Sequence, residues 1–192
     1  MKILFAAAAA ACLLPAAALA QTAPAATNST GFYGTLGYLG TNTQDLDLGA
    51  IQGRLGYRFL PWLGIEGEGA FGVKNDKSSQ VINGVTVDSK VHLRDQEAIY
   101  GVGFLPLSPN FELFGRVGYG HEGAKVTATA LGAGGPVSVA DKVAGDSWNF
   151  GGGGQWFFDD KNGIRADYTR YEFTPRDSGH ADTWALSYVR KF

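Results

Sequence analysis

Apolar side chains recur at every second position through most of this chain, and this period of two limits its fold more than any other feature. The segment 63–73 reads LGIEGEGAFGV, in which Leu63, Ile65 and Phe71 alternate with two glutamates. Successive side chains of a β-strand point to opposite sides of the sheet. The pattern therefore predicts strands that have one apolar face and one charged face.

Short turns and longer connections alternate along the chain. The short turns, near positions 61, 108 and 161, contain proline or the Asn162-Gly163 pair, which end a strand or favour a hairpin. The longer connections are polar or glycine-rich and cover 41–47, 74–90, 121–145 and 174–181. The strands expected between them cover 31–40, 51–59, 63–73, 98–104, 111–119, 148–158, 164–169 and 182–192. This alternation is typical of an up-and-down transmembrane barrel.

Four consecutive glycines, 151–154, interrupt the expected strand 148–158, which reads WNFGGGGQWFF. A phosphate-binding loop requires Gly-Lys-Ser/Thr after its glycines and then a helix, whereas Gln155 and Trp156 follow here and the alternation continues. We interpret the four glycines as strand residues. The first and third face inward and leave room for side chains of facing strands, and the second and fourth face outward, where aromatic rings can cover them.

The residues on each face decide whether such a barrel is soluble or embedded in a membrane. A soluble barrel of the lipocalin kind packs its apolar side chains inside, whereas an outer-membrane barrel turns them toward lipid. Aromatic residues, which favour the lipid–water boundary, gather near strand ends of the apolar face at Tyr57, Phe59, Phe104, Trp156, Phe158, Trp184, Tyr188 and Phe192. The polar face carries charges of both signs at Arg54, Arg58, Glu66, Glu68, Glu97, Glu112, Arg116, Arg165, Asp167 and Lys191.

These two faces predict an all-β fold, an eight-stranded antiparallel up-and-down transmembrane β-barrel whose lumen is filled by paired charges. The bore of eight strands is barely wide enough for side chains. The structural interpretation is that the ion pairs replace water and fix the strand register. The alternative is a narrow, gated conduction path that opens when the lumen charges switch partners; substitution of Arg54 or Glu66 would test it.

The first twenty residues predict a cleavable export signal. A long apolar run ends in Ala18-Leu19-Ala20, and small residues at Ala18 and Ala20 are the pattern of a leader-peptidase site. A transmembrane anchor is the alternative, but Pro15 interrupts the run. A lipid-bearing cysteine is another, but a second apolar run follows Cys12. The expected organisation is a signal peptide at 1–20, a flexible lead-in at 21–30 and the barrel domain at 31–192.

Charge and cysteine content exclude several classes of protein. The chain has 16 Lys and Arg residues against 18 Asp and Glu residues, so no basic excess indicates a nucleic-acid partner. Its one cysteine lies in the expected signal, which leaves no disulfide and no thiolate metal site in the barrel. After Gln21 no apolar stretch has the roughly 20 residues that a membrane-spanning helix needs.

The chain resembles the small eight-stranded outer-membrane barrels of the OmpA/OmpX type, within the porin-like barrels of Gram-negative bacteria. The residues that carry the resemblance are GFYGTLGYLG at 31–40, GGGGQWFFDDKNGIRADYTRYEF at 151–173 and the last strand, which ends in Phe192. The resemblance implies a place in the outer membrane, reached through a Sec-type signal, and contact with outer-membrane lipids and lipopolysaccharide.

The resemblance also implies partners in biogenesis, namely periplasmic chaperones and the barrel-assembly machinery. In that family the machinery reads a terminal aromatic residue and the alternating apolar residues before it. Here the pattern is matched by Trp184, Leu186, Tyr188 and Phe192. Arg190 departs from it, because the family usually has an aromatic residue in that slot.

Some barrels of this size are enzymes that modify lipid A, and the histidines are the residues to weigh for that role. His92, His121 and His180 fall at expected loop–strand junctions on the outer side. His180 has Ser178 and Asp182 nearby, but the His-x-Ser-Asn signature of the deacylases is absent. His121-Glu122 is better explained as a solvated pair than as a metal site. The sequence indicates neither a catalytic residue nor a cofactor.

The function expected from these observations is structural or surface-interacting. The connections 74–90 and 121–145 are the expected contact surfaces, because loops on a rigid barrel carry binding more often than the scaffold does. Their Val/Thr-rich pieces, at 85–87, 126–129 and 137–139, are of a kind that extends strands above the membrane as hairpins. A narrow low-conductance channel is the alternative function, and a lipid A-modifying enzyme is the third.

Overall fold

The computed structural model describes residues 30–43, 46–74, 76–82, 85–132, 135–174 and 179–192, and nearly all of them lie in β-strands. The strands in these ranges are β1 (Gly31–Thr43), β2 (Leu46–Leu60), β3 (Leu63–Lys74), β4 (Asp76–Ile82), β5 (Val85–Pro106), β6 (Phe111–Gly132), β7 (Gly135–Phe157), β8 (Asn162–Thr174) and β9 (His180–Lys191). Within the same residues, no helix is long and apolar enough to cross a membrane. The expected signal, with Ala18 and Ala20, lies outside the described ranges.

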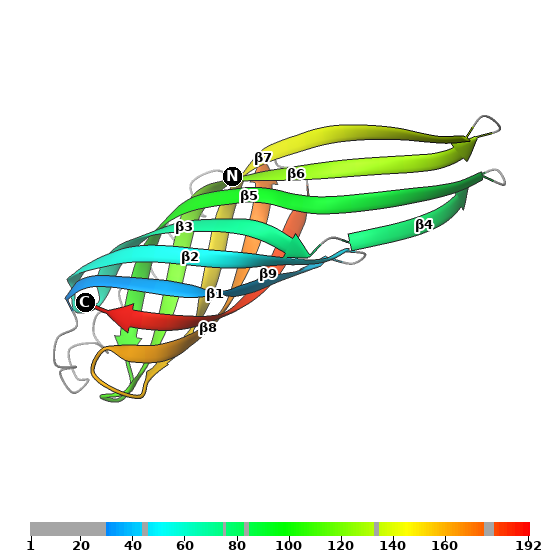
Figure 1. Cartoon of the computed structure of the whole chain (residues 1–192). Coiled ribbons are helices and arrows are strands. Elements are labelled where there is room, and N and C mark those ends of the chain that lie inside the picture. Colours follow the sequence, from blue (N-terminus) through cyan, green and yellow to red (C-terminus); the bar gives the residue numbers. More distant parts are fainter. Residues whose placement is uncertain (1–29, 44–45, 75, 83–84, 133–134, 175–178) are drawn as a thin grey trace.

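Eight of these strands close into an antiparallel barrel. β1 pairs with both β2 and β9, and β3 pairs with β5, so each wall strand has a neighbour on both sides. β4 continues beyond the end of β3 and pairs with the upper part of β5 (Figure 1). The predicted fold class, an eight-stranded antiparallel barrel, is confirmed.

Each predicted short turn joins two strands, near positions 61, 108 and 161. The chain therefore crosses the barrel wall up and down, as in membrane barrels, whose short turns face the periplasm. At the opposite end β5, β6 and β7 continue far beyond the wall, as Figure 1 shows. These strands have 22, 22 and 23 residues.

The prediction that 74–90 and 121–145 are loops is wrong. Nearly all of these residues are strand: β4 pairs with β5, and the upper parts of β6 and β7 pair as far as Gly132 and Gly135. The Val/Thr-rich pieces do extend the strands as hairpins. We name the part of the sheet formed by β4 and by the portions of β5, β6 and β7 beyond the barrel the raised sheet.

The outer surface of the barrel is an apolar band. On β6 it runs from Phe111 to Tyr119, and on β7 from Trp148 to Trp156, which are exposed large apolar residues at both ends. Nine residues match the length of about 9 to 11 that a tilted strand needs to cross a bilayer. Tyr119 and Trp148 meet edge to face at its outer boundary, with their ring centroids 5.3 Å apart.

The four glycines 151–154 lie in the middle of β7, as predicted. A methyl group on Gly154 would lie 3.2 Å from the ring of Phe111, so an aromatic ring does cover this outward glycine. Gly152 differs, because its nearest neighbour is the carbonyl oxygen of Phe114, at 3.0 Å. The inward pair, Gly151 and Gly153, packs against the neighbouring Thr169 and Asp167.

Candidate functional site

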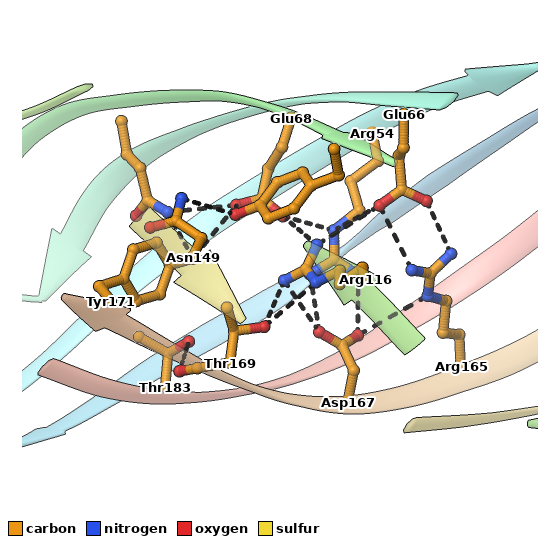
Figure 2. A network of polar contacts seen from close by, with 12 residues as sticks. Arg54, Glu66, Glu68, Arg116, Asn149, Arg165, Asp167, Thr169, Tyr171 and Thr183 are labelled. Atoms are coloured by element: carbon orange, nitrogen blue, oxygen red, sulfur yellow. Dashed lines mark hydrogen bonds and ion pairs between the residues drawn. The ribbon is translucent and has the colours of Figure 1, made fainter. Parts of the chain in front are cut away.

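Three arginines and three carboxylates occupy the middle of the barrel and form what we name the central network. Its members come from strands β2, β3, β6 and β8, and their side chains are fully buried (Figure 2). They are Arg54, Arg116, Arg165, Glu66, Glu68 and Asp167. The formal charges sum to zero, so the interior needs no counter-ion here.

The central network is joined by short charge-assisted hydrogen bonds. Arg54 donates to Glu68 at 2.7 Å and forms a two-point contact with Asp167 at 2.7 and 2.8 Å. Arg116 also joins β3 to β8, because it donates to Glu68 at 2.6 Å and to Thr169 at 2.6 Å. Planar guanidinium groups suit such two-point contacts, which fix orientation as well as charge.

A second charged layer lies nearer the short turns. Arg58 forms a two-point contact with Glu112 at 2.9 and 3.1 Å, and Gln155 also donates to Glu112. The ammonium of Lys191 lies 3.9 Å from the same carboxylate and 3.6 Å from the centre of the Phe157 ring. Both layers lie inside the barrel, and their charged side chains come from strands on different sides of its wall.

The faces of β5 are the reverse of the prediction. Ala98, Tyr100, Val102 and Phe104 point inward, and Phe104 therefore does not belong to the outer aromatic set. Inside, the Phe104 ring stacks under the guanidinium of Arg58 at 3.6 Å, and the Tyr100 ring lies 4.3 Å from that of Arg116. Both faces of β5 are apolar in sequence, so alternation could not decide between them.

Glu97 does not lie in the lumen, which corrects another prediction. It is exposed on the outward face of β5, where it is opposite Gly69 on one side and His121 on the other. Since His121 lies two residues beyond Tyr119, the Glu97 carboxylate sits at the outer edge of the apolar band. The reversed facing of β5 is again the reason. The other nine predicted lumen residues all have buried or largely buried side chains inside the barrel.

The barrel interior also contains an outer mouth that the sequence reasoning missed, formed by Glu122 with Ser147 and Asn149. Hydrogen bonds join this mouth to the central network: Asn149 donates to Tyr100 at 3.1 Å, and Tyr100 donates to Glu68 at 3.3 Å. Ser147 lies 2.7 Å from Glu122. The even positions of β6 carry Glu112 and Arg116, and extending that register would have placed Glu122 inside.

The three histidines do not converge. His121 and Asp146 face each other on the outer surface at 2.7 Å, and this bond raises the pKa of His121 and lowers that of Asp146. Because both side chains are about half exposed, the pair adds little stability. His180 is exposed at the start of β9, the side chain of His92 lies outside the described residues, and so does Ser178. No group of three or more potential metal ligands occurs among the described residues.

The expected assembly residues share the outward face of the last strand. Trp184, Leu186 and Tyr188 are exposed on β9, and Phe192 follows it directly. Lys191, between them, points inward. This arrangement places an apolar, lipid-facing edge of side chains at the end of the barrel wall.

A sheet closed on itself, apolar outside and ionic inside, defines an integral β-barrel membrane protein. Residues 6–192 match the model of the outer membrane protein beta-barrel domain family, and the chain belongs to this family. It is an integral outer-membrane protein, in contact with membrane lipid. The predicted resemblance to small eight-stranded outer-membrane barrels is confirmed.

Solved structures of other barrels are similar to this chain. Ail, the attachment invasion locus protein of Yersinia pestis, solved with the heparin analogue sucrose octasulfate, has 18% identity and a TM-score of 0.55, covering 85% of this chain and 99% of Ail. The N-terminal barrel domain of Pseudomonas aeruginosa OprF has 11% identity and a TM-score of 0.48, covering 85% and 98%. At such identities the likeness concerns the fold alone. No curated protein matches the chain.

Proposed function

We propose that this protein is a closed, non-catalytic barrel that holds the raised sheet above the outer membrane for surface interactions. The observation that carries the proposal is the extension of β6 by 12 residues beyond the band residue Tyr119 and its neighbour, from His121 to Gly132. At about 3.4 Å per residue this part of the strand is about 40 Å long. A structure of this size beyond the lipid serves contacts outside the membrane, not anchorage.

The raised sheet offers two features for binding. In the described residues the two edge strands of the raised sheet each pair on one side only. β4 pairs with β5, and the part of β7 before Asp146 pairs with β6. Such edges present unpaired backbone groups to a partner. Exposed basic residues on it, Lys90, Arg94 and Lys125, suit a polyanionic surface. The heparin analogue bound to Ail makes a sulfated glycan the first ligand to test.

Shortening the raised sheet is expected to abolish surface contact and leave the barrel intact. The variant replaces 76–91 and 124–143 each by Asn-Gly. The first replacement removes all of β4 and its paired part of β5, and the second places a new turn where Gly123 already pairs with Ala144. We expect heat-modifiable migration and membrane permeability to be unchanged, and attachment of expressing cells to a heparin-coated surface to fall at least tenfold. Equal attachment by both forms would contradict the interaction role, and a rise in permeability would favour a structural one.

The closed lumen is the basis for placing the channel function second. Buried ion pairs between guanidinium and carboxylate groups cross the interior, and opening a path would separate these partners. We expect no stepwise current from the refolded protein in planar bilayers at neutral pH, with a known porin as the positive control. Discrete steps that change in Arg54→Gln or Glu66→Gln would support the channel instead.

Lipid A modification stays third in this proposal. In the described part of the chain neither His121 nor His180 has a hydroxyl partner that could act as a nucleophile. A lipid A mass change on expression that is lost in His180→Ala would overturn this.

Biogenesis completes the proposal. We infer that 1–20 directs Sec-type export with cleavage after Ala20, and that periplasmic chaperones then carry the chain. The apolar side chains at the end of the last strand, with Phe192, suit reading by the barrel-assembly machinery. Lipopolysaccharide is the proposed neighbour of the outer half of the apolar band.

A further inference from the structure

Glu122 is the only buried carboxylate of the described interior that no arginine or lysine accompanies. The other four, Glu66, Glu68, Glu112 and Asp167, all lie within an ion-pair distance of at least one basic side chain. Glu122 is 9% exposed, its Oε1 meets only the hydroxyl of Ser147, and its Oε2 has no hydrogen-bond partner. An uncompensated buried charge is costly, so this group requires a proton or a cation.

The outer mouth has fewer hydrogen-bond donors than acceptors. The Ser147 hydroxyl lies 2.7 Å from Glu122 and 2.6 Å from the Oδ1 atom of Asn149, both acceptors. A hydroxyl has one proton and can serve only one of them. In the orientation present, the amide of Asn149 directs its Oδ1 toward Ser147 and donates from Nδ2 to Tyr100 at 3.1 Å. The mouth therefore presents more acceptors than donors.

The surroundings of Glu122 influence the protonation state of its carboxyl group at neutral pH. It lies three residues beyond Tyr119, on the outer side of the apolar band. Burial raises the pKa of its carboxyl to about 7, with smaller raising effects from Glu68 and Asp146 and lowering effects from Ser147 and His121. Near neutral pH the carboxylate form is thus available to a ligand that supplies both charge and donors.

We propose that the outer mouth binds a primary ammonium group, such as that of a polyamine or a lysine side chain, entering from outside. An ammonium carries one charge and three N–H donors, which the Glu122 carboxylate and Ser147 can accept. A metal ion such as Ca²⁺ would need six to eight oxygen ligands, which this mouth does not assemble. The next inward residue of β6 toward its outer end is Ala124, which is small and only partly buried, whereas the space at Gly120 on the other side of Glu122 is closely packed by Ala98 and Asn149.

The test measures the pKa of Glu122 in the refolded full chain in phospholipid nanodiscs, from the ¹³C shift of its carboxyl carbon. Propylammonium is the probe, up to 50 mM, at constant ionic strength. At ten times its dissociation constant a ligand that binds only the carboxylate lowers the pKa by about one unit. Tetramethylammonium is the matched control, because it has the charge but no N–H donor, and we expect it to shift the pKa by less than 0.2 units, on the order of the measurement error.

Two variants complete the test. Glu122→Gln keeps the shape and is expected to remove the propylammonium-dependent shifts of the amide signals of Ser147 and Asn149. Glu97→Gln removes a carboxylate one strand away on the outer face and is expected to leave them. An unchanged wild-type pKa at 50 mM, an equal effect of tetramethylammonium, or shifts that persist in Glu122→Gln would each overturn the proposal. The shortened variant above retains Glu122, so failure of the surface role would not affect this result.

Discussion

Replacing Arg54 by methionine is expected to lower the free energy of unfolding by about 3–5 kcal/mol, because it leaves the buried central network with one uncompensated negative charge. Arg54 contacts two carboxylates, Glu68 at 2.7 Å and Asp167 at 2.7 and 2.8 Å, and its side chain is fully buried. Methionine has a similar length and keeps most of the packing, so the loss reports the charge. The measurement is equilibrium urea unfolding in lipid vesicles, followed by heat-modifiable migration.

A matched substitution separates burial from charge in that experiment. Arg170 lies on the outer face, 3.1 Å from Glu172, and is about half exposed. Arg170→Met should cost less than about 1 kcal/mol, as exposed pairs do. Adding Glu68→Gln to Arg54→Met is expected to recover part of the loss, since the partner left behind is then neutral. If both arginine variants unfold at the same urea concentration, the central network does not stabilise the barrel as argued.

The second large effect is expected at the glycine run. Gly153→Ala should destabilise the barrel by about 1–3 kcal/mol, the usual cost of overpacking. The added methyl group would overlap the carbonyl oxygen of Ala166 and lie 2.7 Å from the Cα of Asp167. These are backbone atoms of the paired strand β8, so the clash cannot be relieved by turning a side chain. Asp167, which anchors Arg54, would be displaced as well.

An outward glycine provides the control for Gly153→Ala. A methyl group on Gly69 would have no atom within 4 Å. Gly69→Ala should therefore be neutral, or stabilising by about 0.4–1 kcal/mol through the lower entropy of the unfolded chain. Urea midpoints of the two variants, measured side by side in vesicles, decide the matter. Equal midpoints would show that the wall can expand at Gly153, and that inward glycines are not required by close strand packing.

Much of the fold and part of the site could be predicted where one face of a strand is charged and the other is not. In β3, Glu66 and Glu68 alternate with Ile65 and glycines. Charged side chains avoid lipid, so the two glutamates must face the interior and Ile65 must face the membrane. β5 lacks this contrast, because Ile99 and Leu105 on one face are as apolar as Val102 and Phe104 on the other. Its register against β3, where Glu66 pairs with Tyr100, settles which face is inside.

The raised sheet shows a different limit. Polar and glycine-rich composition favoured loops at 74–90 and 121–145, yet β6 and β7 pair through to Gly132 and Gly135. Backbone hydrogen bonds between long strands outweigh the weak preferences of single residues, which depend on context in sheets. Only pairing across the hairpin, a non-local interaction, extends these strands.

The amino-acid sequence alone determined that this chain forms an eight-stranded barrel with an apolar outer face and a charged interior. Period-two alternation and turn residues act over short distances in the chain, so they can be recognised without the fold. The sequence also placed Arg54, Glu66 and Arg116 inside. The tertiary structure alone decided which side chains contact one another inside the barrel. It brings Asp167 to Arg54, places aromatic rings of β5 against arginines, and leaves Glu122 without a basic partner. Such pairings join residues up to 113 positions apart, and they depend on the shear of a closed sheet, which no local pattern encodes.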